Sequence, residues 1–294
     1  MNDWREIARR MRFNEGASWA DITRACIPFF PESTEQQVRE CVRSYLRRRK
    51  EYNAPKLDYN GRQMWRYNLD RATLYIIGDV HLGAYGHDLK AYKAYIDRIE
   101  DDETAKVIIL GDLIDCATIG SKGNPHSQTM TPQRQIERTI ELLYPIRDKI
   151  LFACAGNHEE RVYRSTGTDA GKYIMLGLNC LDRYHPVAGY IDIKAGKRRV
   201  KLYATHNIGR AETKIQKLAK SYADIDLILG GHIHTPKVIR TTQKVFGGQQ
   251  RDVTAVICGA WLMDEGYAVS AAYEPVSMAQ PVIYISEQGY TVAV

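Results

Sequence analysis

The stretch Leu74-Tyr-Ile-Ile-Gly-Asp-Val-His-Leu-Gly83 decides the fold that the sequence predicts. It opens with a short run of apolar, β-branched and aromatic residues, which is typical of a buried strand, and the run stops at Gly78. Asp79 and His81 follow directly. Because ligands of open α/β sheets bind beyond the carboxyl ends of the strands, a carboxylate and an imidazole at this place indicate a functional site.

Four more segments repeat the pattern of an apolar run that stops at a small residue and is followed by polar side chains. The runs occupy residues 107–110, 150–154, 200–204 and 227–229. Since these runs are expected to be strands that open into one crevice, their polar residues are expected to share one volume. The residues so placed are Asp79, His81, Asp112, Asn157, His206, His232 and His234.

The chemistry of these seven side chains points to metal ions. Carboxylates, imidazoles and an amide, without a cysteine, suit divalent metals of borderline to hard character. Seven ligands are too many for one tetrahedral ion, so two ions are the simpler interpretation. Two ions about 3.5–4 Å apart can share a bridging carboxylate and a bridging hydroxide, and can hold both oxygens of an in-line displacement at phosphorus.

The same residues admit an interpretation without metal chemistry. A single histidine after a strand is more often a core or loop residue than a ligand, and Gly-Asp or Gly-Asn pairs usually form turns. Five of the eight histidines nevertheless fall within the motifs, namely His81, His158, His206, His232 and His234. The other three, His87, His126 and His185, fit no motif and are expected at the surface or at the lip of the site.

Taken in order, the motifs resemble those of the calcineurin-like metallophosphoesterases. The resemblance covers residues 72 to 294 and rests on Gly78-Asp-Val-His81, Gly111-Asp112, Gly156-Asn-His-Glu159, His206 and Gly231-His-Ile-His234. It implies an α/β fold, a layered α/β/β/α sandwich of two β-sheets flanked by helices. It also implies a ligand set, in which Asp79, His81 and His234 hold one ion, Asn157, His206 and His232 hold the other, and Asp112 bridges them. Mn²⁺ is the expected metal, and Fe²⁺ or Zn²⁺ would also suit nitrogen and oxygen ligands.

Three further residues are candidates for the reaction itself. By the same resemblance, His158 stays free of metal and donates a proton to the leaving oxygen, or polarises it, while a metal-bridging hydroxide attacks phosphorus in line. Asp115 would orient His158 and keep it charged. Arg161 is a candidate phosphate clamp, because a guanidinium matches a phosphate fork, although an exposed loop arginine fits the sequence equally well.

The continuation of the motifs bears on the substrate. Protein Ser/Thr phosphatases of this superfamily continue the second motif as Asp-Arg-Gly, whereas this chain has Asp115-Cys-Ala-Thr118, which counts against that branch. The first and last motifs are more similar to double-strand-break repair nucleases and to exonuclease-like phosphoesterases of phages and prophages. The stretch from residue 130 through residue 150 also resembles those phage proteins. Asn207 departs from the family, which usually has Gly after the metal histidine. A nuclease that hydrolyses DNA is therefore expected.

Residues 1 to about 50 are predicted to form three short helices. Ser18 with Asp21, and Thr34 with Gln37, have the spacing of residues that start a helix. The buried face predicted for the third helix comprises Val38, Cys41, Val42, Tyr45 and Leu46, and its outer face comprises Arg39, Arg43 and Arg47.

Asn60-Gly61 is a strong hairpin signal, and helices followed by a hairpin have the order of a winged helix. We therefore predict a nucleic-acid-binding domain of the helix-turn-helix or winged-helix type at residues 1–70 and a metallophosphoesterase domain at residues 71–294. The third helix would enter a groove, and Arg62 and Arg66 of the wing would meet phosphates. A helical cap or a dimerisation module with solvated arginines is the alternative.

Composition sets the remaining expectations. The net charge of +6 mildly favours an anionic partner such as DNA. The six cysteines form no Cys-x-x-Cys pair and indicate reduced core residues of a cytoplasmic protein. No apolar run reaches the length of a membrane span, so no membrane partner is expected, and homo-oligomerisation is left open.

Two other functions are compatible with the sequence. One is a phosphomonoesterase or a cyclic-nucleotide phosphodiesterase whose helical segment caps the site. The other is a catalytically silent DNA-binding or assembly protein. In each case the loops at residues 118–131, 161–168 and 266–280 are expected to rim the site and to select the ligand, since long irregular connections tend to be functional.

Overall fold

In the computed structural model of the protein, the described residues are 4–13, 18–50, 64–118, 128–209, 212–221, 224–244, 250–263 and 277–294. The chain divides into two compact units, Met1–Gly61 and Arg62–Val294. No helix within the described ranges is long and apolar enough to cross a membrane.

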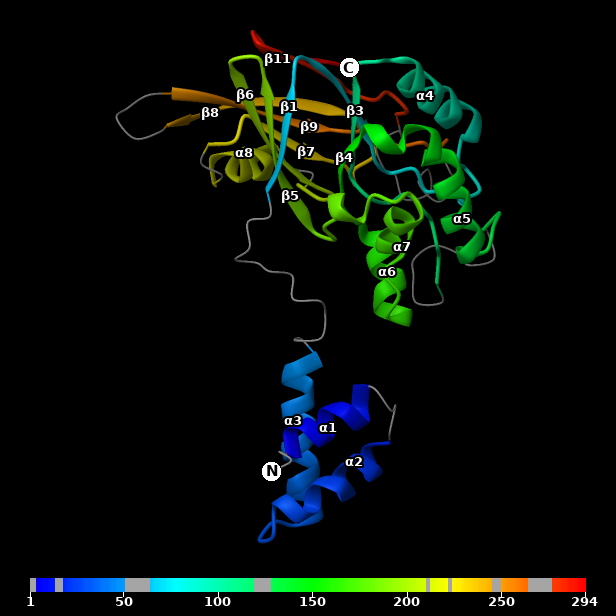
Figure 1. Ribbon diagram of the computed structural model, residues 1–294, viewed down its shortest axis with the longest axis vertical. Helices are drawn as coiled ribbons and strands as arrows, with labels where there is room; N and C mark the ends of the chain where they lie inside the picture. Colours follow the sequence, from blue (N-terminus) through cyan, green and yellow to red (C-terminus); the bar gives the residue numbers. More distant parts are fainter. Residues whose placement is uncertain are drawn as a thin grey trace. The chain divides into compact units, whose positions relative to one another are not determined.

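Two mixed β-sheets form the framework of the larger unit (Figure 1). The six-stranded sheet has the order β1-β5-β6-β7-β9-β8, and the five-stranded sheet has the order β11-β10-β2-β3-β4. The strands are β1 (Met64–Leu69), β2 (Ala72–Ile77), β3 (Ala105–Ile109), β4 (Ile150–Ala153), β5 (Ala188–Ala195), β6 (Arg198–Thr205), β7 (Leu227–Gly230), β8 (Lys237–Lys244), β9 (Gln250–Ile257), β10 (Val282–Ser286) and β11 (Gly289–Ala293).

Five α-helices of the described residues accompany these sheets: α4 (Leu89–Asp101), α5 (Pro132–Leu143), α6 (Asn157–Thr166), α7 (Ala170–Gly177) and α8 (Glu212–Ser221). Short 3-10 helices lie at η3 (Tyr144–Lys149) and η4 (Leu181–Arg183). Helix starts follow local chemistry, since the side chains of Asp88, Thr131 and Asp169 each accept a hydrogen bond from the backbone N–H three residues on.

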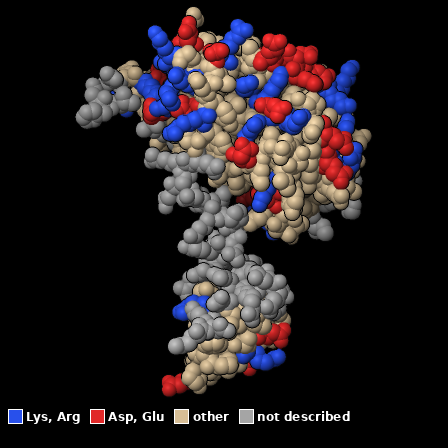
Figure 2. All heavy atoms as spheres, in the orientation of Figure 1, with Lys and Arg blue, Asp and Glu red and all other residues tan. Residues whose placement is uncertain are grey.

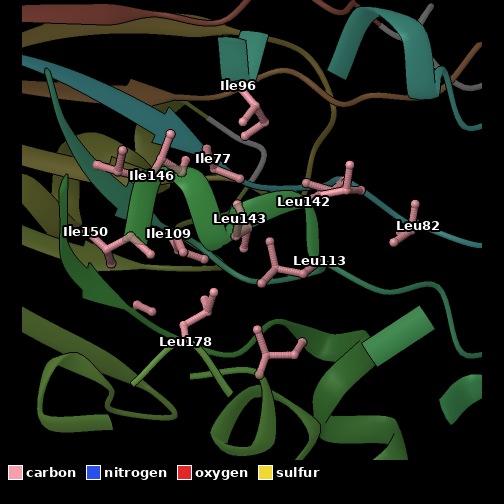
Figure 3. Packing of buried hydrophobic residues seen from close by; sticks show 14 of the residues in the cluster. Ile77, Leu82, Ile96, Ile109, Leu113, Leu142, Leu143, Ile146, Ile150 and Leu178 are labelled. Atoms are coloured by element: carbon pink, nitrogen blue, oxygen red, sulfur yellow. The ribbon is translucent and has the colours of Figure 1, made fainter. Parts of the chain in front are cut away.

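Alternation along the strands divides the apolar residues among three layers of packing. In β2, Leu74 and Ile76 face the six-stranded sheet and join one core cluster, whereas Tyr75 and Ile77 face the helices and join another. Figure 3 shows part of the helix-facing cluster, in which Ile77 and Ile109 lie with Leu142 and Leu143 of α5. A third cluster joins α8 to the outer face of the six-stranded sheet. The predicted fold of two sheets flanked by helices is confirmed.

Parallel pairing places the motif-bearing strand ends at one edge. β2, β3 and β4 are parallel neighbours in one sheet, and β6, β7 and β9 are parallel neighbours in the other. Because parallel strands end on the same side, the connections that leave β2, β3, β4, β6 and β7 emerge together.

The strand β1 includes residues that were expected in the wing and in the smaller domain. Residues 51–63, including Asn60-Gly61 and Arg62, lie outside the described residues. Residues 62–66 were expected as the second arm of a wing, and their described part, Met64 to Arg66, belongs to β1, which pairs in parallel with β5 of the larger unit. The physical reason is burial of Trp65, whose ring packs against Phe152 at 4.8 Å between centroids and whose indole Nε1 donates to Asp182 O at 2.9 Å. Arg66 therefore belongs to a strand of the larger unit.

The smaller unit contains α1 (Trp4–Phe13), α2 (Trp19–Cys26), the 3-10 helix η1 (Ile27–Phe29) and α3 (Glu35–Lys50). The two predicted helix starts are present. The Ser18 hydroxyl accepts from Asp21 N at 3.2 Å, and Thr34 and Gln37 exchange hydrogen bonds between side chain and backbone, at 2.9 and 3.3 Å.

One residue of the predicted buried face of α3 is exposed. Val38 and Val42 are fully buried, but Cys41 is exposed, while the other five cysteines are buried free thiols. Val38 and Val42 are four residues apart and lie one above the other on the helix, whereas Cys41 falls at the edge of that stripe. Arg43 was expected on an outer face, and its guanidinium lies 5.2 Å from the ring centroid of Trp19.

Candidate metal centre

All seven residues that the sequence placed at strand ends converge in the structure. Three overlapping groups have ligand atoms within 4.8 Å of one another: Asp79 with His81 and His234, Asp112 with His206 and His232, and His81 with Asp112 and His158. Asn157 joins the second group, because its side-chain Oδ1 lies 3.0 Å from His206 Nε2. The third group shows that the geometry also admits His158 as a ligand, although the resemblance leaves it free of metal.

The backbone at these positions is strained in the same way. Asp79, His81 and Asp112 each have a φ of 49°, and His232 and His234 have φ values of 73° and 59°. Residues other than glycine rarely adopt this left-handed region, and such strain gathers at functional sites, where the surroundings hold it in place. Here backbone hydrogen bonds hold the loops together, from Asp79 N to Gly111 O at 3.1 Å and from His81 N to Asp112 O at 2.9 Å.

The first group fits a cation. Asp79 is fully buried, and its Oδ1 has no hydrogen-bond partner among the described residues. That oxygen lies 3.5 Å from His234 Nε2 and 3.9 Å from His81 Nε2. The two imidazole nitrogens are themselves 3.1 Å apart. A buried, unsatisfied carboxylate oxygen is costly, and a cation held by all three side chains would satisfy it.

Asp112 lies between the two groups. Its Oδ2 is 3.2 Å from His206 Nε2 and 3.9 Å from His81 Nε2, so one buried carboxylate oxygen faces ligands of both groups. This is the position that a bridging ligand requires. The Nδ1 of His206 donates to the Leu110 carbonyl at 2.7 Å, which directs the lone pair of its Nε2 into the site.

His158 stands beside the bridging carboxylate at the start of α6. Its backbone N–H donates to Asp112 Oδ1 at 2.8 Å, and its Nδ1 donates to the Asp115 carbonyl at 2.5 Å. Burial by itself lowers the pKa of His158, but the charge of Asp112 and the hydrogen bond with Asp115 raise that pKa above its ordinary value. Asp115 Oδ1 lies 3.3 Å from His158 Nδ1 and also 3.6 Å from His81 Nδ1, so it faces a candidate ligand as well.

Glu159 is a residue for which the sequence suggested no role. It is buried, and its carboxylate accepts four backbone N–H groups, from Asp112 at 2.9 Å, Leu113 at 2.8 Å, Ile114 at 3.3 Å and Gly156 at 2.8 Å. One side chain therefore joins the loop after β3 to the loop after β4. The signal that could have revealed it is the Gly156-x-x-Glu159 spacing, which is that of a helix-capping residue.

Gln135 and Gln128 were also missed, and they hold Asp115. Gln135 is fully buried on α5, and its Oε1 accepts the backbone N–H of Asp115 at 3.1 Å and of Cys116 at 2.9 Å. Its Nε2 donates to Gln128 Oε1 at 2.7 Å, and Gln128 in turn donates to the Asp115 carboxylate. Glutamines in an amphipathic helix carry no distinctive pattern, so only the contacts identify this chain of hydrogen bonds.

Arg161 was expected on a loop at residues 161–168, but it lies within α6 and is half-buried. Its positive charge acts to lower the pKa of His158. Its guanidinium has no hydrogen-bond or ion-pair partner among the described residues. The other two expected rim loops, and His126, fall mainly outside those residues.

The remaining two described histidines, His87 and His185, lie in loops. The ring of His87 packs against Tyr92, with centroids 5.9 Å apart. The Nδ1 of His185 accepts backbone N–H groups from Val187 at 3.4 Å and Ala188 at 3.3 Å. Neither histidine belongs to a group of potential ligands among the described residues.

Comparison with known proteins identifies the class. The family model for calcineurin-like phosphoesterases matches residues 72–236, which is more than half of the chain. The chain therefore belongs to the calcineurin-like phosphoesterase family. The family typically binds divalent metal ions, in agreement with the ligand groups described above.

Solved structures resemble the chain at low sequence identity. Vps29 of Entamoeba histolytica, in complex with zinc, is 12% identical with a TM-score of 0.39, and the match covers 75% of this chain and 97% of Vps29. GAP50, described as the anchor in the inner membrane complex of Plasmodium, is 10% identical with a TM-score of 0.40, covering 76% and 84%. The sulfate thiohydrolase SoxB of Thermus thermophilus is 13% identical with a TM-score of 0.39, covering 76% and 56%. No curated protein matches the sequence.

Substitution of Glu159 by Gln is expected to destabilise the larger unit by about 1.5–3 kcal/mol. The reason is that the amide NH₂ group of Gln would face backbone N–H donors that bond to a carboxylate oxygen of Glu159 in the parent protein. Urea denaturation measures the change. Glu160→Gln is the matched control, since Glu160 is exposed and pairs only with Arg164, at 2.6 Å, and should cost less than about 1 kcal/mol. Equal losses in the two variants would contradict the role given to Glu159.

Addition of Mn²⁺ to metal-stripped protein is expected to raise its Tm, because an ion that binds only the folded state stabilises that state. Asp79→Asn, which replaces the unsatisfied carboxylate, should weaken Mn²⁺ binding by more than about tenfold. Thermal unfolding measures the rise in Tm, and titration calorimetry measures the affinity for Mn²⁺. Asp182→Asn serves as control, since that side chain is 79% exposed on η4. An Asp79→Asn variant that binds Mn²⁺ like the parent protein would refute the site.

Proposed function

We propose that this protein is a phosphodiesterase with two divalent metal ions that hydrolyses DNA. The observation that carries the proposal is the buried Asp112 carboxylate, which faces His206 on one side and His81 on the other and accepts the N–H of His158. A shared carboxylate between two ligand groups, with an imidazole beside it, is the arrangement that in-line displacement at phosphorus requires.

The residues would hold the two ions as the family resemblance implies. Asp79, His81 and His234 would hold one ion, Asn157, His206 and His232 the other, and Asp112 both. When bound, such a pair activates water as a nucleophile and neutralises charge on the phosphate oxygens. The contribution of the protein is to hold the ligand side chains in place, because backbone hydrogen bonds join the strained loops that carry them.

His158 is suited to protonate the leaving oxygen. Its Nδ1 is engaged with the Asp115 carbonyl, so Nε2 is the nitrogen that can hold and deliver a proton. The raised pKa of His158, which Asp112 and Asp115 produce against the effect of burial, favours the protonated form that an acid needs. Gln128 and Gln135 support this by holding Asp115.

Arg161 is the candidate phosphate clamp. It lies one turn along α6 from His158, and its guanidinium has no partner among the described residues. An unpaired, half-buried guanidinium near a catalytic imidazole offers two parallel donors to phosphate oxygens. It would bind a nonbridging oxygen of the substrate.

The residue after Asp115 supports a diester substrate. Cys116 stands where protein phosphatases of the superfamily have an arginine, and it is buried with its thiol donating to Gln135 Oε1 at 3.3 Å. No cationic side chain extends to the substrate from this position, so the second negative charge of a phosphomonoester would find no positive partner here. A phosphodiester carries one charge fewer and depends less on such a cation.

We further propose that the smaller unit binds the DNA. On the face drawn in Figure 2, basic and acidic side chains of the larger unit are interspersed, and a uniform basic surface is not seen there. The sequence of α3, by contrast, carries six arginines and lysines against two glutamates. Electrostatic attraction of DNA is therefore assigned to this helix.

The protein with Mn²⁺ is expected to hydrolyse end-labelled DNA. The substitution His158→Ala is expected to lower kcat about 10²- to 10⁴-fold, because the acid is lost.

The substitution Arg161→Ala should raise KM. Arg164 is an exposed arginine on the same helix that pairs with Glu160, so Arg164→Ala should leave kcat and KM unchanged. Intact DNA, with hydrolysis of a phosphomonoester or a cyclic nucleotide, would replace the proposal by a small-molecule esterase. DNA binding without hydrolysis of any phosphoester would indicate a silent assembly protein.

Removal of the smaller unit, by a shortened chain that begins at Arg62, is expected to weaken DNA binding and to flatten its dependence on salt. The reason is that each lost phosphate contact reduces the slope of log Kd against log salt concentration by about 0.7–0.9. Fluorescence anisotropy between about 50 and 200 mM salt measures the slope. Identical slopes for both chains would instead make the helical unit a cap or a dimerisation module.

A further inference from the structure

The loop that follows the first motif presents an aromatic side chain to solvent. Tyr85 is 81% exposed, more than any other large apolar side chain among the described residues. It stands four residues after His81 in the connection between β2 and α4, and seven residues lie between His81 and Leu89, where α4 begins. A chain of four residues spans at most about 14 Å, so Tyr85 lies within nucleotide reach of the metal centre.

The loop around Tyr85 is fixed by backbone hydrogen bonds on every side. Ala84 N donates to His81 O at 2.9 Å, and Thr129 N donates to Gly83 O at 2.9 Å. On the other side of the tyrosine, Met263 N donates to Gly86 O at 2.8 Å. Gly83 has a φ of 99°, and the Gln135 side chain fills the space where its Cβ would lie, at 2.3 Å. The exposed ring is therefore carried by an ordered support.

The same supports hold the candidate metal ligands. Trp261 N donates to Asp79 O at 3.0 Å, and Trp261 O accepts from Asp88 N at 2.9 Å. Residues 261–263 thus join the Asp79 loop to the Tyr85 loop. Met263 is itself 54% exposed and is bonded to the residue after Tyr85. The backbone of Met263 is thus joined to the loop that carries Tyr85.

We propose that Tyr85 is a stacking subsite for a nucleobase of the substrate. The inference rests on the proposed function and names a contact that selects the ligand. An exposed aromatic ring on a rigid support loses little entropy when it binds a base. Stacking on such a ring does not depend on which base is present.

The size of the apolar surface favours a base over a protein partner. Ala84 and Gly86, the neighbours of Tyr85, are buried, so of these three residues Tyr85 alone presents apolar surface. Surfaces that bind proteins are usually larger, with contiguous apolar areas of several hundred Å². One ring matches the face of a single base.

The test compares Tyr85→Ala and Tyr85→Phe on single-stranded DNA and on an abasic strand of equal length, with Mn²⁺ present. Tyr85→Ala should raise KM for DNA about 5- to 150-fold and leave abasic strands unaffected, because only stacking is lost. Tyr85→Phe keeps the ring and should stay within about twofold of the parent. Tyr284→Ala is the control, since Tyr284 is 45% exposed and pairs with Thr73 at the opposite end of β2.

Unchanged KM for DNA in Tyr85→Ala, or an equal rise on abasic strands, would overturn the subsite. If the parent protein cleaves no DNA, the proposed function fails, and the subsite is then judged by calorimetry with Mn²⁺ present. The measurement compares thymidine 5′-monophosphate with deoxyribose 5-phosphate. A preference for the nucleotide that Tyr85→Ala abolishes supports the subsite, and no preference in the parent protein overturns it.

Discussion

The close approach of two loops around the Asp112 carboxylate is the constraint on which the rest of this structure depends. A Cβ atom on Gly156 would lie 2.1 Å from Asp112 Oδ1, and one on Gly111 would lie 2.1 Å from Gly156 N. Glycine is required at both places, because any side chain would drive the loops apart. Their contact lets one carboxylate face histidines from two sheets, and it lets the first turn of α6 present His158 beside it.

Such an arrangement is costly, and the fold offsets the cost locally. Five ligand candidates have left-handed backbone, which costs about 1–3 kcal/mol for each residue. Four buried N–H groups at the loop junction would be unsatisfied without Glu159, whose carboxylate accepts all of them. The site is therefore ordered by its own hydrogen bonds, and a metal ion would enter a cradle that the chain has already formed.

Support for the site extends through hydrogen bonds to elements that carry no ligand. Gln135 on α5 fills the space beside Gly83 and holds the backbone of Asp115, so one buried side chain supports both the Tyr85 loop and the partner of His158. The segment 261–263 does the same for Asp79 and the Tyr85 loop. The candidate ligands, His158 and the Tyr85 loop are thus parts of one connected structure.

The sequence by itself determined the layered α/β class and the convergence of seven side chains, because periodicity and strand-end motifs are local and parallel strands end on one edge. The ligand assignments, the acid role of His158 and the DNA substrate stay predictions. Only the tertiary structure decided that Met64–Leu69 joins β5 and that Glu159 and Gln135 hold the loops. It alone also placed Arg161 on a helix and left Cys41 exposed. Most of these outcomes depend on partners distant in sequence. The exposure of Cys41 depends on its exact angular position on the helix, at the edge of the buried face. Local sequence patterns encode neither.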